Sequence, residues 1–250
     1  MTTAERGRVR VEPSAKRVRA YLAGELVADT TTPYLVWEKP YYPTYYFPRR
    51  DVKATLTPTA ETRHSPSRGE GIVHDVHVKD AVATAAALTY PSSPLPTLHS
   101  LVRFEWDALD EWFEEDEPVY VHPRDPYTRI DALSSSRHIR VEIDGVVIAD
   151  STRPVILFET GLPPRHYLPL TDVRQDLLRH TDLTTGCPYK GTAEYWSAVI
   201  GDAVHENIAW AYRTPLPESR AVAGRIAFYN EKVDVYIDGT QEDRPRTVFS

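Results

Sequence analysis

The chain contains the same pattern twice. Residues 17–52 align without a gap with residues 138–173, at a constant offset of 121 positions. Twelve of these 36 positions are identical, whereas average residue frequencies of about 5–7% would give roughly two matches by chance. The identical pairs are Arg19/Arg140, Gly24/Gly145, Ala28/Ala149, Asp29/Asp150, Thr31/Thr152, Pro33/Pro154, Glu38/Glu159, Pro43/Pro164, Tyr46/Tyr167, Pro48/Pro169, Asp51/Asp172 and Val52/Val173. The repeat indicates a gene duplication that produced two related domains.

Two shorter matches extend the repeat toward the end of each copy. Ser65–Gly69 corresponds to Cys187–Gly191 at an offset of 122, and Val102–Glu114 follows the pattern of Ile226–Asp238 at an offset of 124. A chain of 250 residues suits two domains of about 125 residues each. We therefore expect a degenerate first copy in residues 1–125 and a second copy in residues 136–250. The Pro- and Ser-rich stretch around 122–136 is the expected linker.

Both copies have the patterns of a β-rich fold. Apolar and polar residues alternate over His138–Ile143, and Asp144-Gly145 is a typical tight hairpin turn. The apolar run Val155–Phe158 predicts a strand that is covered on both faces. The 21 prolines favour loops over long helices. The sequence predicts two duplicated, compact, mainly β domains with little helix.

Two further elements are predicted in the second copy. Asp172–His180 has a short amphipathic pattern that predicts a helix capped by Thr171 or Asp172. Residues 221–229 and 233–237 flank a turn at residues 230–232 and predict a hairpin.

Composition restricts the function classes. A net charge of −7 argues against nucleic-acid binding, because neutralising phosphates requires clustered Lys and Arg. No apolar run approaches the length of a membrane span, and the first residues lack the apolar core of a signal peptide, so we expect a cytoplasmic protein without a membrane partner. A single cysteine excludes an internal disulfide and a multi-cysteine zinc site. We expect neither a metal nor a cofactor.

Three motifs of the second copy point to one family. They are ADSTRP at residues 149–154, ETGLPPRHY at residues 159–167, and CPYKG at residues 187–191 followed by Tyr195-Trp196. These motifs resemble the domain-of-unknown-function family 427, which is sometimes labelled nucleotidyltransferase-like, in its tandem form. The resemblance covers most of residues 138–240 and is weaker over the first copy.

The resemblance implies a compact β-domain of the Mss4-like or β-tent type. Proteins with such domains often hold zinc through two cysteine knuckles, which a chain with one cysteine cannot build. The nucleotidyltransferase label finds no support in the sequence, which has no Gly-Ser turn leading into a paired-aspartate metal motif and no P-loop. The resemblance supplies no reaction.

Glu159, Lys190 and Cys187 are the candidate catalytic residues. Glu159 closes an apolar strand just before Thr160-Gly161, where a carboxylate is often half-buried in a site. Cys187 and Lys190 share a turn-rich segment, in which the ammonium would favour ionisation of the thiol and hold an anionic or carbonyl group. The structural alternatives are an ion pair between Glu159 and Arg165, and a turn in which Cys187 only packs.

Aromatic residues are dense around the same motifs. They are Tyr167, Tyr189, Tyr195, Trp196, Trp210 and Tyr212. Tyr and Trp combine apolar surface with a polar tip, which suits a pocket for a flat or cyclic ligand. We expect Tyr167, Arg165, Tyr189, Trp196 and Trp210 to bind the substrate; the alternative is that the aromatic residues belong to the strand core.

The remaining polar residues favour structural roles. His74 and His77 are three apart in an extended segment, which sends them to opposite faces and disfavours a shared metal. Asp234 and Asp238 share a strand face, where a charge cluster at a hairpin end is favoured over a divalent ion.

The sequence thus predicts a cytoplasmic β-protein that binds a small molecule in an aromatic pocket of its second domain. Whether it is an enzyme and which oligomer it forms stay open. One alternative is a non-catalytic module that presents Tyr- and Pro-rich loops to a protein partner. Another is the nucleotidyltransferase activity that the family label suggests.

Overall fold

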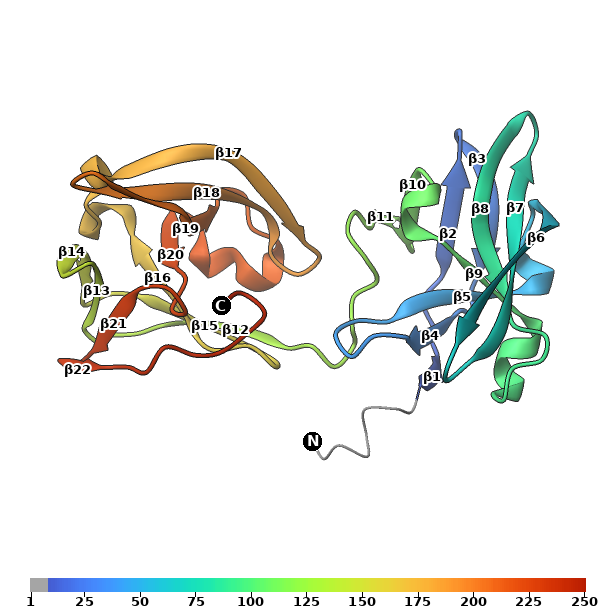
Figure 1. Ribbon diagram of the computed structural model, residues 1–250, viewed down its shortest axis with the longest axis horizontal. Helices are drawn as coiled ribbons and strands as arrows, with labels where there is room; N and C mark the ends of the chain where they lie inside the picture. Colours follow the sequence, from blue (N-terminus) through green and yellow to red (C-terminus); the bar gives the residue numbers. More distant parts are fainter. Residues whose placement is uncertain (1–8) are drawn as a thin grey trace. The chain divides into compact units, whose positions relative to one another are not determined.

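The computed structural model describes residues 9–250. The chain divides between Asp125 and Pro126 into two compact units, which we call the first and second domains. Both are built almost entirely from strands (Figure 1).

The first domain contains a seven-stranded sheet in the order β1-β4-β5-β9-β8-β7-β6 and a four-stranded sheet in the order β11-β10-β2-β3. Its strands are β1 (Arg10–Pro13), β2 (Val18–Leu22), β3 (Glu25–Thr30), β4 (Tyr34–Trp37), β5 (Thr44–Pro48), β6 (Thr55–Ser65), β7 (Gly69–Val78), β8 (Ala81–Thr89), β9 (Leu101–Phe104), β10 (Glu111–Glu114) and β11 (Glu117–Pro118). Its 3₁₀ helices are η2 (Arg49–Asp51), η3 (Pro96–Ser100) and η4 (Trp106–Ala108).

The second domain contains a seven-stranded sheet in the order β12-β15-β16-β20-β19-β18-β17 and a four-stranded sheet in the order β14-β13-β21-β22. Its strands are β12 (Ile130–Ser134), β13 (Ile139–Ile143), β14 (Val146–Ser151), β15 (Val155–Glu159), β16 (Arg165–Pro169), β17 (Leu178–Cys187), β18 (Gly191–Ile200), β19 (Ala203–Tyr212), β20 (Arg225–Phe228), β21 (Asp234–Ile237) and β22 (Thr240–Gln241). Its 3₁₀ helices are η5 (Leu170–Asp172), η6 (Gln175–Leu177) and η7 (Pro217–Val222).

The eleven strands of the second domain repeat those of the first one for one. Both seven-stranded sheets have the same order, and the four-stranded sheets match when one is read from its other edge. The register agrees as well, because Arg19 lies opposite Asp29 in β2 and β3, and Arg140 lies opposite Asp150 in β13 and β14. The prediction of two duplicated β-domains is confirmed.

The turn at Asp144-Gly145 is the predicted hairpin turn. It joins β13 to β14, and its two residues have φ angles of 50° and 77°. Two consecutive positive φ angles are typical of the type I′ turn, whose twist matches that of the paired strands. Ala23 and Gly24 form the same turn in the first domain, with φ angles of 51° and 75°.

Each domain has two hydrophobic clusters, on opposite faces of its long sheet. In β16 of the second domain, Leu168 belongs to one cluster and its neighbour Tyr167 to the other, as expected from the alternation of side chains along a strand. The first cluster fills the space between the two sheets. The second is rich in aromatic residues, and η7 (orange in Figure 1) packs there against β12 and β15.

The predicted helix over Asp172–His180 is wrong. The segment contains only the short helices η5 and η6, and from Leu178 onward it is strand β17, paired with β18. A nine-residue helix is marginal without tertiary support, and here the backbone satisfies its hydrogen bonds in a long β-ladder instead.

The predicted hairpin near residues 221–237 is also wrong. β20 pairs with β16 and β19 in the seven-stranded sheet, whereas β21 pairs with β13 and β22 in the other sheet. The turn at residues 230–232 therefore carries the chain from one sheet to the other. Residues 130–134, expected in the linker, form β12 and pair with β15.

Candidate functional site

Glu159 and Lys190 form an ion pair in the second domain. The Lys190 ammonium donates to the Glu159 carboxylate, and each side chain is only 10% exposed. Glu159 is the last residue of β15, and Lys190 lies in the turn between β17 and β18. Two candidate residues that are 31 positions apart therefore meet at one point.

Gly191 fixes the conformation of the turn that carries Lys190. Its φ angle is 97°, and an added Cβ would lie 3.3 Å from the carbonyl oxygen of Thr214. The Lys190 carbonyl accepts a hydrogen bond of 3.1 Å from the Leu216 amide. Since both the φ angle and the close approach favour glycine, the backbone beneath Lys190 is held tightly.

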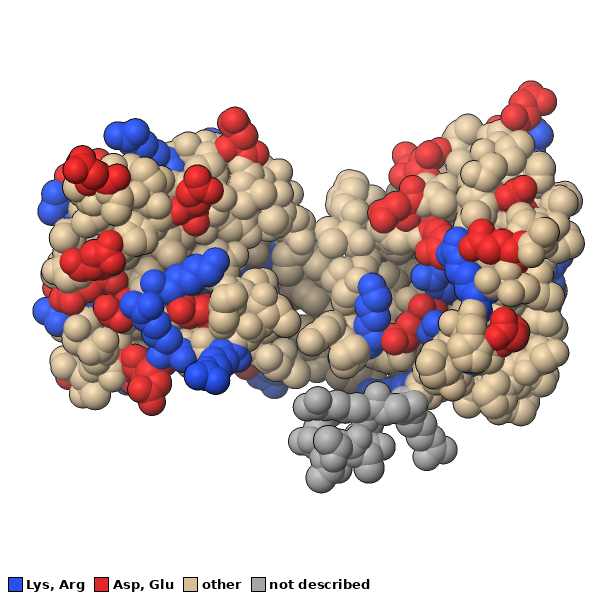
Figure 2. All heavy atoms as spheres, viewed as in Figure 1, with Lys and Arg blue, Asp and Glu red and all other residues tan. Residues whose placement is uncertain are grey.

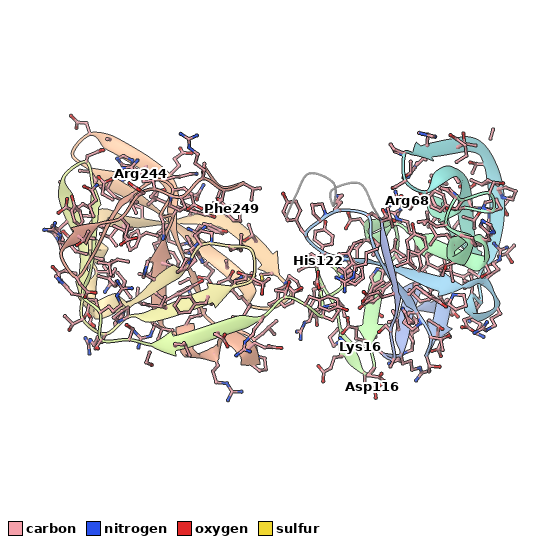
Figure 3. The ribbon with its side chains drawn as sticks, turned by 90° about the horizontal axis from the view of Figure 1, so that it is seen from below. Lys16, Arg68, Asp116, His122, Arg244 and Phe249 are labelled. Atoms are coloured by element: carbon pink, nitrogen blue, oxygen red, sulfur yellow. The ribbon has the colours of Figure 1, made fainter. Side chains whose placement is uncertain are left out.

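The first domain has the same arrangement with different cations. Glu38 corresponds to Glu159, and it lies 3.3 Å from the guanidinium of Arg68 and 3.0 Å from that of Arg103. Arg68, labelled in Figure 3, lies in the turn between β6 and β7, where the second domain has Lys190. Glu38 also accepts a hydrogen bond of 2.6 Å from the Tyr46 hydroxyl. A carboxylate paired with a cation is thus common to both domains.

The second domain gives its carboxylate fewer donors. Ala227 stands where the first domain has Arg103, and the Tyr167 hydroxyl accepts a hydrogen bond of 3.0 Å from the Trp210 indole. Among residues 9–250, Lys190 is the one donor that we find on Glu159, whereas Glu38 has three close donor groups. Glu159 therefore keeps capacity to accept further hydrogen bonds.

Tyr167 and Trp210 belong to a buried aromatic cluster, which favours the alternative that these residues are part of the strand core. Tyr167 is 1% exposed and Trp210 is 7% exposed, and their rings meet edge to face at 6.2 Å. Burial raises the pKa of Tyr167 above its ordinary value. Tyr195, Tyr212 and Tyr229 complete the cluster. Burial also raises the pKa values of Tyr212 and Tyr229, so the hydroxyls of these two residues and of Tyr167 stay protonated at neutral pH.

Cys187 packs against the same cluster. It is half-buried at the end of β17, and its backbone lies opposite Gly191 in the β-ladder. Ser65 occupies this place in the first domain. The three candidate catalytic residues therefore surround one region of the second domain.

Arg165 does not pair with Glu159. Its guanidinium donates two hydrogen bonds of 2.7 Å to Glu231, and the two side chains are 6% and 0% exposed. Burial pushes the pKa of Glu231 upward, but the hydrogen bonds from Arg165 and Thr247 outweigh it, so that the pKa is lowered. Arg165 thus has a fixed partner inside the protein.

Aromatic rings enclose the Arg165 guanidinium. Its carbon lies 5.5 Å from the centre of the Trp210 ring and 5.8 Å from those of Tyr229 and Phe249. Phe249, labelled in Figure 3, comes from the segment that follows β22. Glu231 and Tyr229 were not among the predicted site residues, because Glu231 lies in the stretch interpreted as a hairpin turn and Tyr229 directly precedes it.

Trp196 does not join the cluster. It lies on the other face of β18, packs against the core between the two sheets, and meets the His180 ring at 5.1 Å. Its neighbour Tyr195 faces the cluster instead. Tyr189 is half-buried in the turn beside Lys190.

Residues 9–250 contain no group of three or more His, Cys, Asp or Glu side chains that could hold a metal ion. His74 is buried, and its Nε2 lies 2.8 Å from the Thr89 hydroxyl. Asp238 pairs with Arg137, and Asp234 with Arg244. In Figure 2, small groups of acidic and basic side chains lie next to one another on both domains.

None of the helices in the described part of the chain has the length and apolar character needed to cross a membrane.

The family described as a domain of unknown function, DUF427, matches residues 10–115 and 131–239. No curated protein matches the chain. The two matched ranges together cover most of the sequence and coincide with the two repeated sheet arrangements. The chain therefore belongs to the DUF427 family and carries its domain twice.

Proposed function

We propose that the second domain binds a small molecule at Glu159 and Lys190. The observation that carries this proposal is the difference between the two copies. The first domain surrounds Glu38 with Tyr46, Arg68 and Arg103, whereas Glu159 has Lys190 alone among the described donors. A carboxylate and an ammonium with unused hydrogen-bonding capacity, beside an aromatic cluster, suit a ligand with both a donor and an acceptor.

The chemistry of the pair defines the ligand. Lys190 donates to a carbonyl or anionic oxygen, and Glu159 accepts an N–H or O–H from the same molecule. Tyr167 and Trp210 are 1% and 7% exposed, so they would support the pair from the buried aromatic cluster rather than contact the ligand. Tyr189, in the turn beside Lys190, would contact it. If the protein is an enzyme, Glu159 is the proton acceptor and Cys187 the optional nucleophile.

The burial of the tyrosines argues against a protein partner that docks on aromatic side chains in this region. Tyr167, Tyr195 and Tyr212 are 1%, 7% and 5% exposed, so they do not form a flat surface patch. The proposed location remains the cytoplasm. Nucleotidyl transfer stays an alternative that only the family label suggests.

A second candidate function is a non-catalytic module that binds a protein partner, and exposed tyrosines of the first domain favour it. Tyr41 is 68% exposed and Tyr120 is 84% exposed. Such side chains offer apolar surface with a polar tip to a protein partner.

A pair of simple probes tests the small-molecule proposal. 2-Pyridone is a flat ring with adjacent carbonyl and N–H groups, and N-methyl-2-pyridone lacks the donor for Glu159. In protein-observed NMR titrations, we expect 2-pyridone to shift the amides of Glu159, Lys190 and Gly191 more strongly than its methylated analogue does.

Variants of both domains test whether these shifts arise from binding at Glu159 and Lys190. Ala227→Arg places a second cation next to Glu159, where the first domain has Arg103. We expect this variant to remove the chemical-shift changes caused by 2-pyridone. Glu159→Gln should weaken them, whereas Glu38→Gln in the first domain should leave them unchanged. Equal responses to both probes, or responses that survive Ala227→Arg, would count against the proposed site.

A further inference from the structure

The first domain has an open hollow with mixed charge. It is lined by Arg17, Asp29, Thr30, Thr31, Thr32, Arg50 and Asp51, and its volume is about 580 Å³. The hollow is separate from the region around Glu38 and Arg68 and lies where β3 and η2 end.

An arginine occupies the corresponding place in the second domain. Arg153 donates to both carboxylate oxygens of Asp172, through Nε at 3.1 Å and a terminal nitrogen at 2.8 Å. The same terminal nitrogen donates to the Thr171 hydroxyl at 2.9 Å. In the aligned sequence Thr32 stands in place of Arg153, and Arg50 in place of Thr171.

The surroundings of the two aspartates are otherwise the same. Thr30 donates to Asp51 at 2.7 Å, and Ser151 donates to Asp172 at 2.7 Å. Each aspartate ends a three-residue 3₁₀ helix, η2 or η5. Isolated β-bridges follow in both domains, Ala28 with Val52 and Ala149 with Val173. The first domain therefore has the carboxylate but no arginine at the position of Arg153.

The arginines lining the hollow do not replace the missing contact. Arg17 is bound to Asp29 by two hydrogen bonds of 2.8 and 2.5 Å. The Arg50 Nε lies 3.8 Å from an Asp51 oxygen, and this side chain is 75% exposed. Arg153 donates to both carboxylate oxygens of Asp172. Within residues 9–250, no arginine makes the corresponding pair of hydrogen bonds with Asp51.

We propose that the hollow of the first domain binds the guanidinium group of a ligand, either free arginine or an arginine side chain of a peptide. The guanidinium would donate to both oxygens of Asp51, in the place that Arg153 takes in the second domain. Paired N–H donors match a carboxylate in a geometry that an ammonium cannot reproduce. A ligand with its own carboxylate would also meet the exposed Arg50.

NMR titration of the full chain tests this site. We expect L-arginine to shift the amides of Thr30, Thr31 and Asp51 in a saturable manner. L-citrulline, its neutral analogue, should bind at least tenfold more weakly. N-acetyl-L-arginine amide separates the two sources: tighter binding of L-arginine favours a free ligand whose carboxylate meets Arg50, and equal binding favours a peptide side chain.

Thr32→Arg supplies the missing side chain from within the protein. This variant should abolish arginine binding, whereas Thr57→Arg, an exposed position on β6, adds the same charge and should leave binding intact. Asp51→Asn keeps the size of the side chain and should also abolish arginine binding. This variant replaces Thr32→Arg in the test if Thr32→Arg does not fold.

The reverse change provides an independent readout. Arg153→Thr should lower the melting temperature of the second domain, and L-arginine should restore part of the loss, whereas L-citrulline should not. The proposal is overturned if L-arginine causes no saturable shifts at the hollow of the wild-type protein, or if the shifts persist unchanged in Thr32→Arg or Asp51→Asn.

Discussion

The Glu159 carboxylate lies within hydrogen-bonding reach of the Lys190 ammonium, and both side chains are nine-tenths buried. The matching residues of the first domain, Glu38 and Arg68, are 3.3 Å apart and similarly buried. Duplication has therefore preserved the pairing while changing the cation and the number of surrounding donors. This difference leads us to place a ligand site in the second domain.

Removing one partner of this pair should destabilise the second domain. Lys190→Met leaves a nearly buried carboxylate without its cation, which typically costs about 3 kcal/mol. The double variant Glu159→Gln/Lys190→Met should recover a large part of that loss, because no unpaired charge remains. Urea unfolding of Glu159→Gln, Lys190→Met and the double variant measures the coupling, and additive effects of the two changes would show that the pair does not act as a unit.

Arg165 should be more important for stability than for ligand contact. Arg165→Met leaves the fully buried Glu231 unpaired, and we expect a loss of about 3–5 kcal/mol in the free energy of unfolding. The control is Arg174→Met, because Arg174 and Asp176 are 57% and 60% exposed. Exposed ion pairs contribute little to stability, so this variant should unfold at nearly the same urea concentration as the wild type. Similar losses for both variants in urea unfolding would contradict the role assigned to Arg165.

His166 should make the second domain less stable in acid. Burial, with help from Arg137 and Arg165, lowers the pKa of His166 from 6.5 to about 4. Between these two values the unfolded chain binds a proton that the folded chain does not. Stability should therefore fall as the pH decreases from about 6.5 to about 4, by on the order of 3 kcal/mol in total, with no further contribution from this group below that range.

The first domain suggests the control for this pH dependence. Tyr45 corresponds to His166 and is 2% exposed, so His166→Tyr introduces a side chain that the same fold accommodates. The variant should have a shallower slope of unfolding free energy against pH in this window. An unchanged slope would show that other groups cause the acid sensitivity.

The repeat allowed much of the fold to be predicted from sequence. The matched turns and apolar runs specified two equal β-domains, and Asp144-Gly145 specified a hairpin. The helix expected from Asp172 failed because a short periodic pattern does not reveal that a long neighbouring strand, β18, is available for pairing. A short local sequence pattern predicts secondary structure poorly where pairing with a distant strand satisfies the backbone hydrogen bonds.

The candidate site was harder to predict. The motifs contained Glu159 and Lys190, but the partner of Arg165 lies 66 positions away, and no local pattern connects Arg165 with Glu231. Trp196 and Tyr195 are adjacent, so one of them must leave any given face of β18. The sequence did not reveal which face carries the aromatic cluster.

A crystallographic screen with flat, cyclic fragments is the direct test of a ligand site at Glu159 and Lys190. We expect fragments with adjacent carbonyl and N–H groups to bind with the carbonyl on Lys190 and the N–H on Glu159, close to the aromatic cluster of Tyr167 and Trp210. Such fragments should be absent from Glu38, which Tyr46, Arg68 and Arg103 already surround. Fragments that bind equally at Glu38, or that consistently leave the Glu159–Lys190 region empty, would show that the second domain has no specific ligand site there.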